Sequence, residues 1–325
     1  MPALVPKDSP VLCNLPENPE PPGARVGYLN TIDNIRLRYA IWPRTGETRR
    51  GTICLVHGRT EFIEKYFETI EDFRKRGFCV ATFDWRGQGG SQRLIRNTRL
   101  GFVESFDDYI TDLNSFHARQ LLPECPLPFY LVGHSMGALA ALMAAARDRL
   151  MFDRLFLTSP MLSIPSLPIS VNGVALVTEG LAFAGLGALP AGRKGDGEPT
   201  EENFPGNPLT SDHRRYMRVP KIYAERPDLI VGAPTIRWAA AAFRAMSRAA
   251  MDDFAARISV PVFMLGAAND RVVSTSAIEQ LGLRMRTGRH AVLAKARHEL
   301  FVESNPIRDR VLAAFDAFVT EKSEI

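Results

Sequence analysis

The chain has 325 residues, of which 46% are apolar and 23% are charged, and its formal net charge at pH 7 is +4. A chain of this length and average composition can bury a sizeable core, which excludes wholesale disorder and a fibrous architecture. Lysine and arginine are scattered among acidic residues without a long run of one sign, so we expect no nucleic-acid partner.

The N-terminal segment and the cysteines indicate the cellular location of the protein. Residues 1–23 are rich in proline and lack the basic and apolar stretches of a secretory signal, so we predict an extended arm. The four cysteines are Cys13, Cys54, Cys79 and Cys125. They lie far apart and two fall in apolar runs, which favours buried thiols over metal ligands or disulfides. We therefore expect a cytoplasmic protein, and peripheral attachment to the inner membrane face stays open.

The first predicted elements form a sheet. Residues 35–42 alternate apolar and polar side chains and, with residues 25–29, predict an antiparallel N-terminal hairpin. Short apolar runs then alternate with segments of helical periodicity, which predicts crossover connections and a mostly parallel sheet. The runs expected to be strands are 51–56, 78–83, 129–132 and 155–158, and the helical segments include 64–76 and 106–120.

This alternation stops between residues 160 and 235, which are rich in proline, glycine and short apolar patches. It resumes with helices at 236–256, 274–285 and 305–318 and strands at 260–265 and 290–293. We therefore predict an α/β fold in three parts: an arm at 1–23, a core at 24–159 and 236–325, and a helical cap or lid at 160–235.

The strongest local motif is Gly133-His134-Ser135-Met136-Gly137, between the predicted strand at 129–132 and an alanine-rich helix. A strand, a sharp turn with small flanking residues and a helix are together typical of a nucleophile elbow, in which a serine is held at a strained turn. The motif predicts that Ser135 is a nucleophile in an α/β-hydrolase fold. An ordinary tight turn is the alternative.

A serine hydroxyl needs a histidine to accept its proton and a carboxylate to orient that histidine. In this fold the chain order is serine, acid, histidine, and the catalytic loops follow the carboxyl ends of strands. Asp270 and His298 satisfy both conditions. His290 does not, because it begins a strand. The alternatives are a turn-capping role for Asp270 and a surface or helix-capping role for His298.

An oxyanion hole needs two backbone N–H groups that already point to the developing negative charge. One comes from the residue after the nucleophile, here Met136. The other comes from the loop after the strand that ends at Val56, where Arg59 is the expected donor and His57 a structural turn residue. This chemistry requires neither a metal ion nor an organic cofactor, and we predict none.

With these residues in place the chain resembles the serine hydrolases that include bacterial lysophospholipases and monoacylglycerol lipases, a group also described as serine aminopeptidase S33-like hydrolases. The resemblance runs from Ile35 to Phe318 and rests on five ordered motifs: HGRTE at 57–61, DWRGQGGS at 84–91, the serine elbow, NDR at 269–271 and RHE at 297–299. It implies a cap in the region where the alternation stops, and a bracing rather than catalytic role for residues 84–91. Thr60 replaces the second glycine of the His-Gly-x-Gly motif of monoacylglycerol lipases. In this respect the chain is more similar to the lysophospholipase branch.

Two features favour a lipid substrate. Three arginines are expected near the mouth of the site: Arg59, Arg214 and Arg215. One of them could meet a phosphate head group, since guanidinium groups recognise phosphate well; the alternative is that Arg59 pairs with Glu61 or Glu64 in solvent. Residues 170–189, including Phe183, predict a helix that faces an acyl pocket or an interface, or that packs on the core. An interfacial helix would bring the cap to a membrane surface.

We predict that Ser135 cleaves a carboxylic ester of a small monoacyl lipid through an acyl-enzyme, as a lysophospholipase or monoacylglycerol lipase does. Two alternatives stay open. Cleavage of amides or peptides uses the same triad, and a noncatalytic protein can keep the fold as a binding module. The acyl length, the head group and the oligomeric state do not follow from the sequence.

Overall fold

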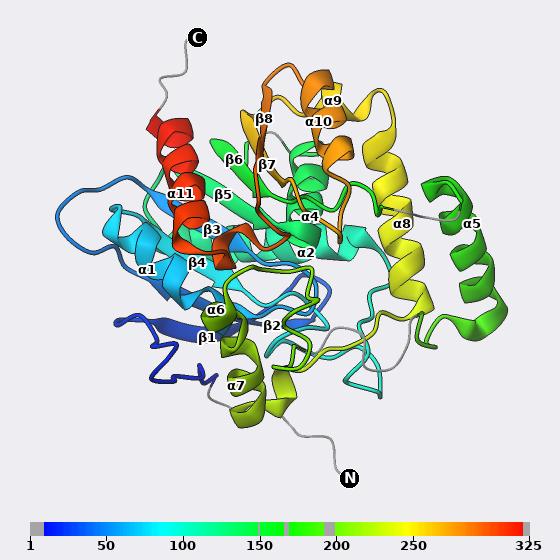
Figure 1. Ribbon diagram of the computed structural model, residues 1–325, viewed down its shortest axis with the longest axis horizontal. Helices are drawn as coiled ribbons and strands as arrows, with labels where there is room; N and C mark the ends of the chain where they lie inside the picture. Colours follow the sequence, from blue (N-terminus) through cyan, green and yellow to red (C-terminus); the bar gives the residue numbers. More distant parts are fainter. Residues whose placement is uncertain (1–9, 149, 166–168, 192–198, 321–325) are drawn as a thin grey trace.

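The computed structural model describes residues 10–148, 150–165, 169–191 and 199–320. Its centre is an eight-stranded sheet in the order β1-β2-β4-β3-β5-β6-β7-β8 (Figure 1). β1 pairs with β2, and β2 with β4, in antiparallel fashion, and the other neighbours are parallel. The strands are β1 (Arg25–Asn30), β2 (Arg36–Trp42), β3 (Thr52–Val56), β4 (Cys79–Phe83), β5 (Phe129–His134), β6 (Arg154–Thr158), β7 (Val262–Ala267) and β8 (Gly288–Leu293). The predicted N-terminal hairpin and mostly parallel sheet are confirmed.

Helices connect these strands and cover both faces of the sheet. They are α1 (Phe67–Lys75), α2 (Phe106–Phe116), α3 (Leu122–Glu124), α4 (Ser135–Ala145), α5 (Val171–Leu181), α6 (His213–Tyr216), α7 (Arg218–Glu225), α8 (Ile236–Ala250), α9 (Phe254–Arg257), α10 (Thr275–Arg284) and α11 (Asn305–Thr320). Short 3₁₀ turns lie at η1 (Ile63–Tyr66), η4 (Pro227–Leu229) and η5 (Leu300–Val302), and π-helical turns at η2 (His117–Leu121) and η3 (Ala182–Leu186).

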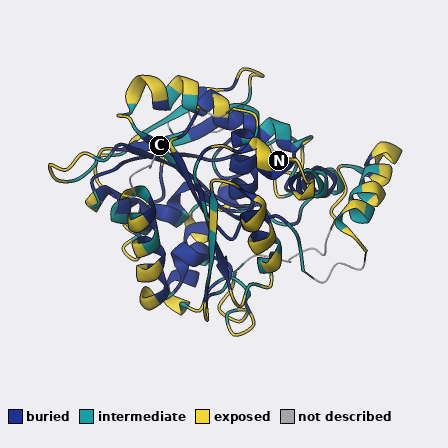
Figure 2. Ribbon diagram, turned by 90° about the horizontal axis from the view of Figure 1, so that it is seen from above, coloured by how far each residue is buried: buried dark blue, intermediate teal, exposed yellow. Residues whose placement is uncertain are grey.

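The inner strands are buried along their whole length because both faces of the sheet are covered. Every residue of β3, β4 and β6 is buried, as expected of parallel strands between two helical layers. One apolar cluster joins the sheet to α1 and α11, and a second joins the opposite face to α2, α4, α8 and α10. Figure 2 shows these buried strands enclosed by helices whose outer surfaces are exposed.

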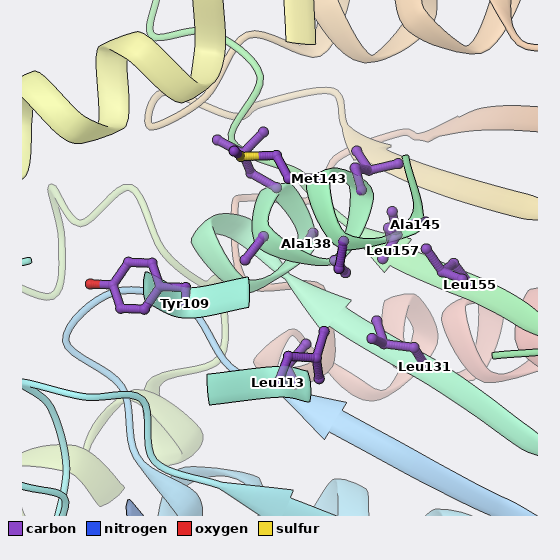
Figure 3. Packing of buried hydrophobic residues seen from close by; sticks show 14 of the residues in the cluster. Tyr109, Leu113, Leu131, Ala138, Met143, Ala145, Leu155 and Leu157 are labelled. Carbon is purple, nitrogen blue, oxygen red and sulfur yellow. The ribbon is translucent and has the colours of Figure 1, made fainter. Parts of the chain in front are cut away.

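Helix α4 follows β5 without a loop and is buried on every side. All of its residues are buried, so it carries alanine, leucine and methionine around its whole circumference and lacks a polar face. In Figure 3, Ala138 and Met143 of this helix belong to the same buried cluster as Leu131 of β5 and Leu157 of β6. This packing fixes the first turn of α4 at the carboxyl end of the sheet.

The segment predicted as a cap, 160–235, carries α5, α6 and α7 in place of the strand–helix alternation. Helix α5 lies against α8 at the edge of the molecule, and none of its residues is buried (Figure 1). Residues 192–198 lie outside the described residues. The bounds of the cap as a separate unit stay a prediction. In the described part of the chain, no helix is both long and apolar enough to cross a bilayer.

The described part of the predicted arm packs onto the core. Leu12 and Cys13 are buried, and the indole N–H of Trp42 donates to the carbonyl of Pro21 at 2.9 Å. Residues 1–9 of the predicted arm lie outside the described residues. Among the cysteines, Cys13, Cys54 and Cys79 are buried, Cys125 is partly buried, and all four are free thiols.

Candidate active site

Ser135 lies at a strained turn between β5 and α4. Its φ of 51° is in the left-handed region, which a residue with a side chain rarely adopts. The flanking glycines permit this turn, since a Cβ on Gly137 would lie 2.4 Å from the carbonyl oxygen of His57 and one on Gly133 would lie 3.1 Å from the Cα of Ala138. This is the geometry expected of a nucleophile elbow.

His298 joins the other two predicted residues. Its Nε2 lies 3.0 Å from Oγ of Ser135, and its Nδ1 lies 2.8 Å from Oδ2 of Asp270. Asp270 follows β7 and His298 follows β8, so both loops leave the carboxyl edge of the sheet at which Ser135 also lies. The side chains of His298 and Asp270 are 5% and 0% exposed, so water competes little for their hydrogen bond.

The Asp270 carboxylate is held ionised and fixed in direction. Its Oδ1 accepts hydrogen bonds from the amides of Val272 at 2.8 Å and Val273 at 2.9 Å. Burial raises the pKa of this carboxyl, but the hydrogen bond and charge of His298 and the two amides outweigh burial, so the pKa lies below its ordinary value. An ionised Asp270 accepts the Nδ1 proton of His298, which leaves Nε2 free to accept the proton of Ser135.

The loop 57–60 presents its amides in different directions. Gly58 donates its N–H to the carboxylate of Glu61, and Thr60 donates its N–H to Oε1 of Gln88 at 2.6 Å. Between them, the N–H of Arg59 has no acceptor among the described residues. The N–H of Met136 lies in the first turn of α4, where helix amides have no intrahelical partner. Both amides predicted for the oxyanion hole are therefore available to a ligand.

A buried ion network links this loop to the loop of His298. The ammonium of Lys65 lies 2.7 Å from Glu61 and 2.6 Å from Glu299, which follows His298 directly. Ser159 also supports that loop, because its hydroxyl donates to the carbonyl of His298 at 2.8 Å. The sequence alone does not predict these contacts. Glu61 and Glu299 stood in recognisable motifs, but only the fold places Lys65 between them.

His134 packs against the catalytic candidate His298, with ring centroids 4.8 Å apart. Burial lowers the pKa of His134 to about 3, so this neighbour is neutral at physiological pH and adds no second positive charge beside His298. The sequence indicated only that position 134 lies inside the elbow motif.

The four residues predicted to contact substrate occupy very different environments. Arg215 is buried and binds Glu68 and Asp212, so its guanidinium already has two carboxylate partners, and its contact with a head group stays a prediction. Arg214 is exposed, and Phe183 is 93% exposed on the turn after α5. Neither lies against the triad in this structure. Their contact with a substrate stays a prediction.

The fourth, Arg59, does not pair with the acids considered for it. Glu61 binds Lys65, and Glu64 binds Arg38 at 2.7 Å, so the alternative of a solvent ion pair with either acid is wrong. Arg59 instead donates from Nη1 to the carbonyl of Gly232 at 2.7 Å, and its guanidinium lies 5.5 Å from the ring centre of Trp238.

One cavity lies apart from the converging side chains. A cavity of about 530 Å³ lies at the amino ends of β3 and β4, where Gly51 and Cys79 line it, and it contains no residue of the triad. Within the described ranges, no group of three or more histidine, cysteine, aspartate or glutamate side chains is placed to hold a metal ion. The convergence of Ser135, His298 and Asp270 therefore identifies the candidate site.

Comparison with known proteins identifies the family of the chain. Residues 47–305 match the family model described as serine aminopeptidase, S33. Lysophospholipase L2 of Escherichia coli strain K12 is 30% identical over 88% of this chain and 85% of its own length. A probable lysophospholipase L2 of Haemophilus influenzae is 27% identical over 91% of this chain and 92% of its own length.

A soluble variant of monoglyceride lipase from Saccharomyces cerevisiae has a similar structure. It has a TM-score of 0.72 and 17% identity, and the match covers 92% of this chain and 96% of that one. At this identity the likeness supports the fold alone, which is the α/β-hydrolase fold predicted from the elbow. The family match covers most of the chain and contains all three residues of the candidate triad. The chain therefore belongs to the serine aminopeptidase S33 family and is a serine hydrolase related to lysophospholipases.

Proposed function

We propose that this protein hydrolyses carboxylic esters of monoacyl lipids, as a lysophospholipase or a monoacylglycerol lipase, with Ser135 as nucleophile, His298 as base and Asp270 as the orienting acid. The observation that carries the proposal is the position of His298, whose two ring nitrogens lie 3.0 Å from Ser135 and 2.8 Å from Asp270. A surface histidine or a turn-capping aspartate would not need this double contact.

The reaction follows from these contacts. Oγ of Ser135 attacks the ester carbonyl carbon while Nε2 of His298 takes the hydroxyl proton. The negative charge on the carbonyl oxygen is held by the amides of Arg59 and Met136, and one such donor is typically worth about 3 to 4 kcal/mol in the transition state. Return of the proton from His298 to the departing alcohol leaves an acyl-enzyme, which water hydrolyses with His298 again as base.

The lipid character of the substrate is supported by relatives and by α5. Two lysophospholipases align along nearly the whole chain. The segment predicted as the cap exposes Leu176, Val177 and Phe183, which are 77%, 54% and 93% exposed. Exposed apolar side chains on one helix and the turn after it are typical of a segment that lies in a membrane interface. We include this peripheral contact in the proposal.

Amide cleavage is the second candidate, and the name of the matched family, serine aminopeptidase, favours it. The triad chemistry is shared, so turnover of p-nitrophenyl esters beside aminoacyl anilides separates the two functions. We expect ester turnover to exceed anilide turnover. The reverse order would replace the proposed esterase with an amidase.

Labelling by a fluorophosphonate tests the nucleophile directly. We expect the wild-type protein to be labelled and Ser135→Ala to be unlabelled, with residual esterase activity lower by a factor on the order of 10⁶. Ser170→Ala changes a serine that caps α5 and serves as a matched control that stays labelled. An unlabelled wild-type protein would mean a noncatalytic binding module.

A further inference from the structure

Most deeply buried cations of this protein lie against a carboxylate. Five of them contact a carboxylate oxygen at 2.5 to 2.7 Å: Arg38, Lys65, Arg86, Arg215 and Arg308. Such pairing is expected, because an arginine keeps its charge in proteins and a buried charge without a counter-charge is costly.

Arg59 departs from this arrangement. It is only partly exposed, and it contacts no carboxylate among the described residues. Its surroundings are aromatic and carbonyl groups, namely Trp238, Tyr109, Tyr223 and the Gly232 carbonyl. Burial lowers the pKa of its guanidinium, and the two tyrosines oppose that effect. The charge of Arg59 is therefore partly desolvated, and no carboxylate among the described residues neutralises it.

The guanidinium also keeps unused donors. Among the described residues, Nη1 donates to the Gly232 carbonyl, and Nε and Nη2 have no acceptor. These two nitrogens are not sealed from solvent, since the residue is partly exposed. A second ligand can therefore reach this group.

The backbone of Arg59 lies at the candidate nucleophile. A Cβ on the preceding residue, Gly58, would lie 3.2 Å from Cβ of Ser135. The N–H of Arg59 is the proposed oxyanion donor, so the side chain of the same residue extends from backbone that lies beside Ser135. Planar guanidinium groups bind phosphate oxygens with two parallel hydrogen bonds.

We propose that the Arg59 side chain binds the phosphodiester of a monoacyl glycerophospholipid while Ser135 attacks its acyl ester, so that the enzyme selects lysophospholipids over neutral monoacylglycerols. This inference rests on the proposed function. The phosphodiester of the substrate supplies the negative charge that no carboxylate among the described residues provides to Arg59.

Arg59→Gln tests the proposal, because it removes the charge but keeps the backbone N–H. The measured quantity is the ratio of kcat/KM for lysophosphatidylcholine to kcat/KM for a monoacylglycerol with the same acyl chain. Charge-assisted hydrogen bonds contribute about 1.5 to 3 kcal/mol, so we expect this ratio to fall by about tenfold to a hundredfold. Arg59→Lys should restore part of it, since a point charge remains.

Arg93→Gln is the matched control. Arg93 is also partly exposed and donates to a carbonyl of the same segment, that of Asp228 at 2.7 Å, but it lies near the acids Asp84 and Asp228. We expect its ratio to equal that of the wild-type protein. An Arg59 that only anchors residue 232 would lower turnover of both lipids in the same proportion, and an unchanged ratio in Arg59→Gln overturns the proposal.

Two readouts separate this failure from failure of the proposed function. The first outcome is a wild-type protein that is labelled by a fluorophosphonate and cleaves monoacylglycerol, while Arg59→Gln leaves the ratio of the two kcat/KM values unchanged. That outcome supports the esterase function and contradicts the phosphate subsite. A wild-type protein that is neither labelled nor active on either lipid contradicts both the esterase function and the phosphate subsite.

Discussion

At the scale of single residues, Asp270 is held by hydrogen bonds to both of its carboxylate oxygens. Its side chain is fully buried, one carboxylate oxygen faces His298 and the other accepts two backbone amides. A neutral amide of the same shape at this position could turn its NH₂ group toward His298. The imidazole would then be held in the tautomer that cannot accept the serine proton.

Asp270→Asn should therefore lower kcat for ester hydrolysis by a factor of about 10⁴ while the protein stays folded. Steady-state hydrolysis of a p-nitrophenyl ester measures the loss, and thermal unfolding followed by circular dichroism checks the fold. Asp252→Asn changes an exposed carboxylate and should leave kcat at the wild-type value. A loss of less than tenfold in Asp270→Asn would remove Asp270 from the proposed triad.

At the scale of elements, one carboxylate connects the segment predicted as the cap to the core. Glu68 of α1 binds Arg215 of α6 at 2.7 Å, Arg218 of α7 at 2.5 Å and Arg308 of α11 at 3.4 Å. Burial raises the pKa of Glu68, but the hydrogen bonds and charges of the three arginines outweigh burial and hold the pKa below its ordinary value. A lowered pKa in the folded state stabilises the fold wherever the unfolded chain would still be ionised.

We expect Glu68→Gln to lower the free energy of unfolding at pH 7 by about 1 to 3 kcal/mol, since charged hydrogen bonds are lost. The contribution of Glu68 is complete above its unfolded pKa of about 4.3 and is lost as the pH falls through the lower folded pKa. Urea unfolding at several pH values should show the difference between variant and wild type shrinking below about pH 4. Glu279→Gln, at an exposed site on α10, should show no such difference. A pH-independent difference would contradict the assigned ionisation of Glu68.

Periodicity in the sequence predicts the elements around Ser135 but not every element boundary. The predicted strand before Ser135 and the helix after it are both present, because the apolar run and the alanine-rich run are continuous. The predicted helix at 236–256 is instead two helices, since Met251 adopts an extended conformation with ψ of 145°. Phe254 and Ala255 of α9 are still buried, so the apolar pattern continues across the break and conceals it.

At the scale of the whole molecule, α5 stands against α8 at the edge of the fold (Figure 1). Leu176, Val177 and Phe183 are exposed there, close together on one helix and the turn after it. An apolar surface of this kind lowers its free energy by entering an interface, at roughly 1.5 to 3 kcal/mol for each large side chain that becomes buried.

The double variant Leu176→Ser/Phe183→Ser should therefore bind phosphatidylglycerol vesicles at least tenfold more weakly than the wild-type protein, as measured by cosedimentation. Leu283→Ser is the matched control, because Leu283 is 78% exposed on α10, away from α5. Its vesicle binding should equal that of the wild type. Equal binding by the double variant would remove α5 from the proposed membrane contact.

The sequence by itself determined the order of the strands along the chain, the elbow around Ser135, and Asp270 and His298 as partners. Each of these follows from local pattern or from chain order, which do not depend on side-chain direction. Only the tertiary structure decided which charges are neutralised. Arg215 and Arg59 look alike as isolated arginines, but packing brings Glu68 to the first, which also binds its near neighbour Asp212. The second meets aromatic rings and a carbonyl, with no carboxylate contact among the described residues. Glu68 and Arg215 are 147 positions apart in the chain, Gly232 and Arg59 are 173 positions apart, and no local pattern encodes that proximity.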